Sequence, residues 1–255
     1  MMSGSLDYRI RPFRDEDGEQ VKALYHDEVG YSPMSMHRFI MRSSLTRPNS
    51  IMCYIVFGVG IALAFVFGNP RSIRAAAAFA MSIASVLFFV VHRWQLSVVT
   101  RSFAKSIATD PDFRGLSEWY GISRHSDGAT YCSGKSGFWV AELLDRELGT
   151  GVIVGCVGLD ANSKQGTHHH HRTAQLRRMA VSWKMRRQGV GRSLIESLLE
   201  HAKEVKLEVI ELQTNGHCCS AVGIYETLGW VAYETQGASG KPWVDLWSIR
   251  YRLEL

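Results

Sequence analysis

The sequence lacks the cysteine spacing of a disulfide framework or a zinc site. It has five cysteines, an odd number, and no CxxC pair among them: Cys53, Cys132, Cys156, Cys218 and Cys219. We therefore expect reduced thiols in a cytosolic environment. The segment Met1–Asp7 also lacks an apolar stretch, so we expect no secretory signal peptide there.

Blocks of like charge are absent as well. Lys and Arg total 29 against 24 Asp and Glu, the formal net charge is +5, and the basic residues are spread along the chain. This mild excess favours an anionic ligand or an anionic membrane surface, and it does not require nucleic acid as a partner. The length of 255 residues suits one domain with an insertion, or two small domains.

Charged residues are missing from two neighbouring apolar runs, Ile51–Gly68 and Ala75–Val91. The sequence Gly68-Asn69-Pro70 between them is a turn signal. As a helix, each run would be roughly 25–27 Å long, close to the hydrocarbon core of about 30 Å. We predict a membrane hairpin over residues 49–94. The alternative is a helical hairpin buried in a soluble protein.

The hairpin divides the remaining chain into residues 1–48 and 95–255. The first part should hold a short strand at Tyr8–Arg11 and a helix after it. The second part should begin with an amphipathic helix around Val98–Ile107. We expect mostly loop over residues 110–134, because this stretch is polar and contains several glycines.

Strand and helix patterns alternate along the rest of the chain. The expected elements are a strand hairpin at Phe138–Ala141 and Val152–Leu159, a strand at Leu176–Val181, a helix at Gly189–Val205, a strand at Val209–Leu212, a helix from Ser220 to Leu228, and strands at Trp230–Tyr233 and Trp247–Leu253. This order predicts an α/β (α+β) fold around one mixed, twisted sheet, with the membrane hairpin inserted after the first strand and helix.

The stretch Leu176–Gly191 points most clearly to a chemistry. An apolar strand runs into a basic turn, and a helix begins at Val190 or Gly191. The first N–H groups of a helix have no internal partner and suit a pyrophosphate. Gly189 and Gly191 would allow close approach of a ligand. Three arginines would add positive charge: Arg186, Arg187 and Arg192. The alternative is an ordinary strand–turn–helix with solvated arginines.

This turn resembles a known cofactor signature. Arg186-x-x-Gly189-x-Gly191 is similar to the acetyl-CoA motif Q/R-x-x-G-x-G/A of the GNAT superfamily, and Ala221–Trp230 is similar to its closing motif A-x-x-L-Y-x-x-x-G-F. The family's first three strands resemble Arg9–Pro12, Phe138–Glu142 and Ile153–Gly155. The apolar hairpin resembles the camello-like, membrane-bound branch, which includes cysteine-S-conjugate and aspartate N-acetyltransferases.

The resemblance implies the GNAT acyl-CoA N-acyltransferase fold and direct transfer of acetyl from acetyl-CoA, a co-substrate, to an amine. It implies that Tyr225 serves the leaving thiolate, where the alternative is an aromatic that packs in the core. It also implies these cofactor-binding residues: Met179, Ala180, Val181, Arg186, Arg187, Gln188, Gly189, Val190, Gly191 and Arg192.

The sequence does not name a general base. Gln175 stands where some relatives carry glutamate, and an amide cannot take a proton at neutral pH. Glu142, Glu211 and a water chain are the candidates. Cys218 replaces the asparagine that is common at its place in soluble relatives.

Two further clusters invite other chemistries. Consecutive histidines, His168–His171, cannot all face one ion, so we expect a solvated loop and no metal site. Cys218 and Cys219 suggest an acetyl-cysteine route, but no Cys–His–acid set is evident, so packing thiols are expected.

We therefore expect a membrane-anchored N-acetyltransferase that acts on a small amino acid or amino-acid conjugate. The alternatives are a protein-lysine acetyltransferase and a non-catalytic acyl-CoA-binding sensor. The expected partners are acetyl-CoA, a small amine and membrane lipid, without nucleic acid. We expect the endoplasmic reticulum membrane, with the catalytic domain facing the cytosol, because more arginines flank the hairpin than lie in its turn.

Overall fold

The computed structural model describes residues 7–67, 72–108, 110–144, 151–162, 172–216, 219–237 and 247–255. Its centre is a seven-stranded sheet in the order β1-β4-β5-β6-β7-β9-β8. The strands are β1 Tyr8–Pro12, β4 Gly137–Leu143, β5 Val152–Asp160, β6 Thr173–Val181, β7 Val209–Asn215, β8 Val231–Gly237 and β9 Trp247–Glu254. Neighbouring strands are antiparallel, except that β6 and β7 are parallel. The predicted mixed sheet and the β4–β5 hairpin are confirmed.

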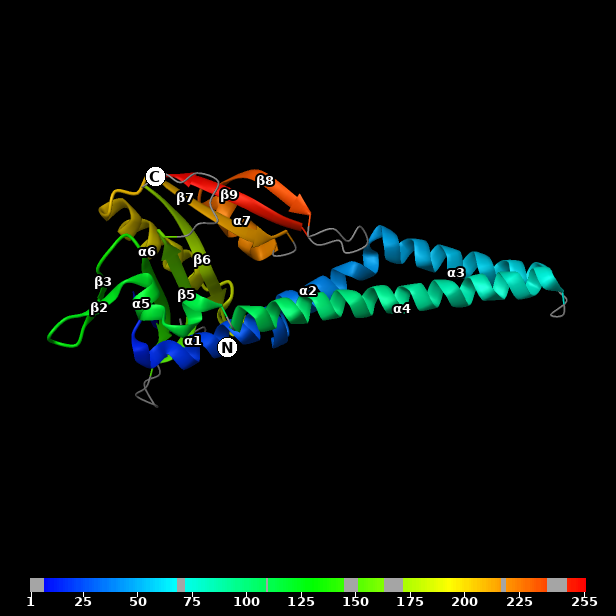
Figure 1. Ribbon diagram of the computed structural model, residues 1–255, viewed down its shortest axis with the longest axis horizontal. Helices are drawn as coiled ribbons and strands as arrows, with labels where there is room; N and C mark the ends of the chain where they lie inside the picture. Colours follow the sequence, from blue (N-terminus) through cyan, green and yellow to red (C-terminus); the bar gives the residue numbers. More distant parts are fainter. Residues whose placement is uncertain are drawn as a thin grey trace, which may run out of the picture.

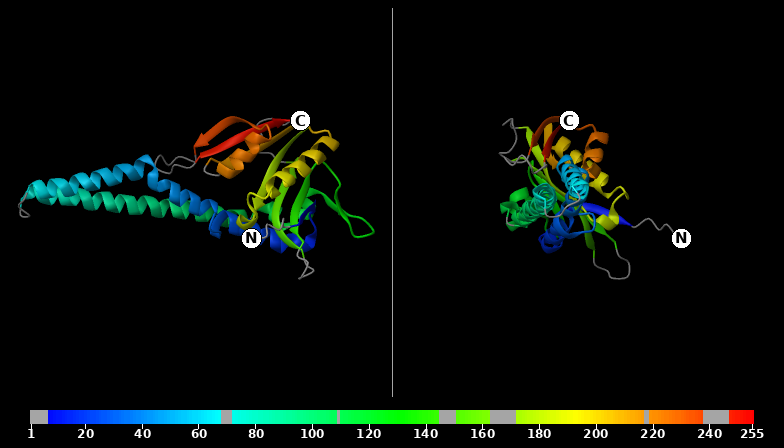
Figure 2. Two further views of the ribbon diagram at one scale, coloured as in Figure 1. Left: turned by 180° about the vertical axis from the view of Figure 1, so that it is seen from behind. Right: turned by 90° about the vertical axis from the view of Figure 1, so that its right-hand side faces the viewer.

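Helices cover both faces of this sheet (Figures 1 and 2). On one face lie α6 (Val190–Glu204) and α7 (Cys219–Thr227), and Leu194 and Leu198 of α6 are fully buried in the larger core. On the other face lies α1 (Gly18–His26), where Val21 is buried in a second core. We call these the α6 face and the α1 face.

The α1 face also carries the segment that was expected to be mostly loop. It holds η4 (Pro111–Arg114), α5 (Leu116–Tyr120), and a small sheet of β2 (Ile122–Arg124) and β3 (Thr130–Cys132). The expectation was wrong because elements of three to five residues are too short to show a hydrophobic period. Burial of their few apolar side chains in the second core stabilises them.

Two long helices, α3 (Pro48–Val66) and α4 (Ile73–Ala108), project from the sheet as an antiparallel pair, with α2 (Met36–Ser43) beside their base (Figure 1). We expected the second apolar helix to end near Trp94, and this is wrong. The helix α4 continues through the whole amphipathic segment as one 36-residue helix. No glycine or proline interrupts it, and Leu96 is buried against Ile40 of α2.

Small residues let the two helices approach closely. Gly60 of α3 is buried, and the hydroxyl of Ser82 donates to the carbonyl of Phe57 over 3.2 Å. The hydroxyl of Ser85 donates to the carbonyl of Cys53 over 2.7 Å. These bonds cross between α3 and α4, so the hairpin is a packed unit.

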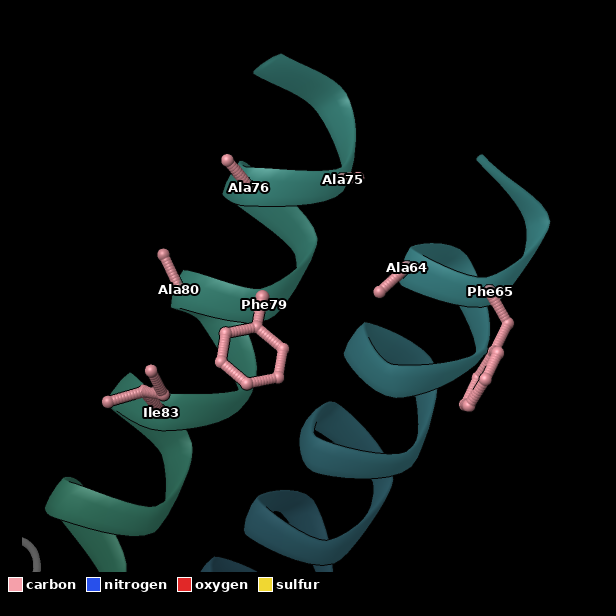
Figure 3. Close-up of a pocket in the computed structure, with 7 residues that line it drawn as sticks. All are labelled: Ala64, Phe65, Ala75, Ala76, Phe79, Ala80 and Ile83. Atoms are coloured by element: carbon pink, nitrogen blue, oxygen red, sulfur yellow. The ribbon is translucent and has the colours of Figure 1, made fainter. Parts of the chain in front are cut away.

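The outer surface of this hairpin is apolar and exposed. Phe65 is 81% exposed and Ile73 is 88% exposed. Both helices are long and apolar enough to span a membrane, and only 17% and 28% of their most apolar windows are buried. The described part of the chain therefore does not bury this hairpin in its own core. Near the tip, an apolar groove is lined by Ala64, Phe65, Ala75, Ala76, Phe79, Ala80 and Ile83 (Figure 3).

Candidate functional site

The glycine turn after β6 has the geometry expected of an anion site. The strand ends at Val181, η5 (Trp183–Met185) follows, and α6 begins at Val190. Gly189 precedes the helix with φ of 84°, a conformation that glycine adopts readily. Its position has no side-chain capping bond, so the first N–H groups of α6 are available to a ligand.

Gly191 has a second, internal reason to be glycine. A Cβ atom there would lie 3.1 Å from Cε of Met179 and 3.4 Å from Cδ1 of Ile224. The first turn of α6 therefore packs directly on β6 and α7. Close approach of a ligand to Gly189 and Gly191 stays a prediction.

The three predicted arginines differ in their surroundings. The guanidinium of Arg186 donates to Oε2 of Glu28 over 2.7 Å. Arg192 forms an ion pair with Glu196 at 3.4 Å on the exposed side of α6. Arg187 has a positive φ of 65° within the turn. Only Arg186 is thus fixed by a buried partner.

Glu28 was not found from the sequence. It lies in the π-helical turn η2 (Asp27–Tyr31), is 7% exposed, and also accepts a hydrogen bond from the backbone N–H of Trp183 over 2.8 Å. This carboxylate holds both ends of η5 in place. Since 158 positions separate Glu28 from Arg186, no local pattern indicates the contact.

The strands β6 and β7 separate beside this turn. They pair in parallel from Thr173 opposite Val209 to Leu176 opposite Leu212. Beyond Leu176, the paired residues of β6 are Arg177, Ala180 and Val181, and their partners lie in β5 on the other side, while β7 continues against β9. The edge of β6 over Met179, Ala180 and Val181 is therefore open toward β7. A chain with amide groups, such as a pantetheine arm, fits such an edge.

Tyr225 lies at the same place. Its side chain is 4% exposed, and its hydroxyl donates to the sulfur of Met179 over 3.4 Å. Its ring also packs against two other aromatic rings, with centroid distances of 5.9 Å to Trp230 and 6.2 Å to Tyr251. The structure thus brings together three predicted site residues from three elements: Met179, Gly191 and Tyr225.

The two candidate bases, Glu142 and Glu211, have different surroundings. Glu142 accepts from Nε of Arg9 over 2.6 Å and from Nε of Arg11 over 2.9 Å. Burial raises the pKa of Glu142, but these hydrogen bonds and charges outweigh burial, and its pKa lies below the usual range. Such a carboxylate is a poor base. Glu211 is 4% exposed and lies opposite Gln175 on the neighbouring strand, and both point to the α1 face.

One of the described cysteines has a weakly acidic thiol. Cys156 is fully buried, and burial raises the pKa of its thiol to about 12. Among the described residues, no group of three or more His, Cys, Asp or Glu side chains could hold a metal ion. Cys218, the side chain of Cys219 and His168–His171 lie outside the described part of the structure.

The profile of the acetyltransferase (GNAT) family matches residues 101–230, which include β6, the glycine turn and Tyr225. The chain belongs to this family. The predicted enzyme class, an acetyl-CoA-dependent N-acetyltransferase, is thereby confirmed.

Relatives and solved structures agree with this assignment. The chain is 25% identical to human N-acetyltransferase 8B over 87% of its own length and 83% of the relative. It is 24% identical to rat N-acetyltransferase 8 over 87% and 85% of the two chains. A GNAT acetyltransferase of Staphylococcus aureus shares the fold with a TM-score of 0.51, at 13% identity over 98% and 99% of the chains. The predicted GNAT fold and camello-like branch are confirmed.

Proposed function

We propose that this chain is a membrane-anchored N-acetyltransferase that moves acetyl from acetyl-CoA to the amine of a small amino acid or amino-acid conjugate. Residues 1–48 and 95–255 would form the catalytic domain, and residues 49–94 the membrane hairpin. The proposal rests chiefly on one observation: β6 and β7 diverge beside a glycine turn that opens a helix.

This geometry fits the two polar parts of acetyl-CoA. The pyrophosphate would bind the N–H groups at the start of α6, over Gln188, Gly189, Val190 and Gly191, with Arg186, Arg187 and Arg192 supplying charge. The pantetheine amides would pair with the open edge of β6 over Met179, Ala180 and Val181. The thioester would then lie between β6 and β7.

The transfer would be direct. The amine nitrogen attacks the thioester carbonyl carbon, the carbon–sulfur bond breaks, and the sulfur leaves as a thiolate. The hydroxyl of Tyr225 would donate its hydrogen bond or proton to that thiolate. We assign the proton released by the amine to Glu211, directly or through water, because its buried carboxylate neighbours Gln175 on the α1 face.

The hairpin would hold the enzyme at the membrane of the endoplasmic reticulum. Its exposed apolar surface supports contact with lipid acyl chains. β1 before the hairpin pairs with β4 after it, so both ends of the hairpin would emerge on the same side. Basic residues flank the base of the hairpin, which favours the cytosolic side: Arg38, Arg42, Arg47, Arg93, Arg101 and Lys105.

Turnover of the detergent-solubilised full chain would test the proposal. Release of free coenzyme A would be measured with free amino acids, cysteine conjugates and lysine peptides as acceptors. We expect turnover with an amino acid or a conjugate. Turnover with lysine peptides alone would replace the proposal by a protein acetyltransferase. Acetyl-CoA binding without turnover on any acceptor would replace it by a sensor.

A further inference from the structure

The open strand β6 contains a bulge at Arg178. Cys156 of β5 lies opposite Ala180, and Gly158 lies opposite Arg177, so one extra residue is inserted in β6. Arg178 has φ of 54°, which is unusual for a residue with a side chain. Its carbonyl accepts a hydrogen bond from the Cys156 thiol over 3.3 Å.

The bulge changes which way the following side chains face. Leu176 and Met179 both pack in the core of the α6 face, although three positions separate them. The side chains of Arg177 and Arg178 both turn to the α1 face, where Arg177 pairs with Asp160 and Arg178 packs against Phe113. In a regular strand, Met179 would face away from α6, because successive side chains alternate.

A buried ion network holds Arg178. Its Nε donates to Oδ2 of Asp112 over 2.7 Å and its Nη2 donates to Oδ1 of Asp112 over 2.7 Å. Nη2 also donates to Asp110. The side chains of Arg178 and Asp112 are only 6% and 2% exposed. Tyr120 donates its hydroxyl to Asp112 over 3.1 Å, so the carboxylate is fixed from two sides.

Electrostatics keep this pair charged. Burial alone would raise the pKa of Asp112. The hydrogen bonds and the charge of Arg178 lower this pKa by more than burial raises it, so the net shift is downward. The ring of Phe113 lies 4.7 Å from the guanidinium carbon. The network is therefore well formed at neutral pH.

We infer that Arg178 is a positioning residue for the co-substrate: its ion pair with Asp112 fixes the bulge, and the bulge aims Met179 and the open edge of β6 at the pantetheine arm. Met179 accepts a hydrogen bond from Tyr225, and its Cε would lie 3.1 Å from a Cβ atom placed on Gly191. The inference rests on the proposed acetyl-CoA site.

The same network links the site to the hairpin. Asp110 and Asp112 follow the end of α4 at Ala108, and both bind Arg178. The segment that directly follows α4 of the hairpin therefore binds Arg178 in the bulge of β6.

The chain offers a matched control for this pair. Asp17 binds Arg11 of β1 through two bonds of 2.7 and 2.8 Å, and its side chain is 7% exposed. This pair also joins a strand to the segment packed on the α1 face, but it lies at the far strand β1. Asp112→Asn and Asp17→Asn each remove one charge from a buried bidentate pair.

Binding of two probes to the purified full chain separates positioning from folding. Acetyl-CoA would contact both the glycine turn and β6. Phosphoadenosine diphosphate, the part of coenzyme A without the pantetheine arm, would contact the turn only. We expect Asp112→Asn to weaken acetyl-CoA binding about tenfold or more while the fragment binds as in the wild type. Asp17→Asn should leave both affinities unchanged.

Four results decide the outcome. If Asp112→Asn lost the same affinity for both probes, Arg178 would only stabilise the fold. The same would follow if Asp17→Asn lost as much acetyl-CoA affinity as Asp112→Asn. Arg178→Gly adds a second check, because glycine accepts the bulge conformation without the guanidinium. Wild-type affinity in that variant would overturn the inference. A wild-type chain that binds neither probe would instead refute the proposed function.

Discussion

The hydroxyl of Tyr225 lies 3.4 Å from the sulfur of Met179, although one residue belongs to α7 and the other to β6. The contact bridges the two elements where β6 and β7 diverge. A phenol at this point lies beside the proposed path of the thioester, so its role can be tested by removing one atom.

Tyr225→Phe keeps the ring packing and deletes the hydroxyl. If the hydroxyl serves the leaving thiolate, kcat should fall about 100-fold or more with a smaller change in KM. Initial-rate kinetics would show the split. Tyr251→Phe is the control, because this buried tyrosine donates to Glu226 and packs in the same core. A Tyr225→Phe enzyme with wild-type turnover would reassign Tyr225 to packing.

Gly189→Leu should weaken acetyl-CoA binding steeply while the fold survives. The side chain would lie at the start of α6, where its Cβ would meet the hydroxyl of Tyr8 at 3.6 Å. The φ of 84° adds a strain of about 1–2 kcal/mol to the folded state. Calorimetric titration with acetyl-CoA would measure the loss.

Gly229→Leu provides the control for that strain. Gly229 has φ of 89° after α7, and a Cβ there would meet Cδ1 of Leu253 at 3.8 Å, an ordinary contact, so the strain should be similar. Thermal unfolding should then report comparable destabilisation for the two variants. If their acetyl-CoA affinities were also equal, the glycine turn would not be the site.

Two carboxylates should differ in their effect on the rate. Glu211→Gln should lower kcat at neutral pH, because an amide cannot take the proton from the amine. Glu142→Gln should keep a kcat near that of the wild type, because the Glu142 carboxylate already accepts hydrogen bonds from Arg9 and Arg11. Initial-rate kinetics at neutral pH should show a fall in kcat for Glu211→Gln only. The reverse pattern would make Glu142 the base.

Glu142 should instead appear in the pH dependence of stability. Its pKa is lower in the folded state than in the unfolded state, so its contribution is present above about pH 4.3. The contribution is lost as pH falls through the folded pKa. Acid unfolding should therefore be shallower for Glu142→Gln than for the wild type. Parallel curves would contradict the assigned shift.

The hairpin can be tested at Gly60. A Cβ there would lie 2.3 Å from Oγ of Ser82 and 2.8 Å from the carbonyl oxygen of Ala78, so Gly60→Val should force α3 and α4 apart. Such overpacking costs about 1–3 kcal/mol. Gly58→Val is the control, because a Cβ there would have no atom of another described segment within 4 Å. Thermal unfolding in detergent should show a loss for Gly60→Val alone, and equal melting temperatures would contradict the packing.

The proposed membrane anchoring makes a prediction about the two termini. Since β1 and β4 pair across the hairpin, both termini should lie on one side, and we expect the cytosolic side. Protease treatment of sealed microsomes should remove a tag from either terminus. A C-terminal tag protected until detergent is added would refute the cytosolic side. Protection of one terminus only would contradict the shared sheet itself.

The sequence by itself determined the elements whose signal is local. Two long uncharged runs predict the hairpin because apolar length alone decides it. The turn Arg186–Gly191 predicts the start of α6, because glycine placement and helix periodicity lie within one short stretch. The strands with clear alternation, above all β9, follow for the same reason.

Only the tertiary structure decided the contacts that join distant segments. Arg178 and Asp112 are 66 positions apart in the sequence, and Arg186 and Glu28 are 158 apart. No local sequence pattern therefore predicts either hydrogen-bonded pair. The bulge at Arg178 and the divergence of β6 from β7 lie beside these long-range bonds. The unbroken course of α4 likewise depends on the burial of Leu96 against α2, because packing overrides the local polarity of His92–Trp94.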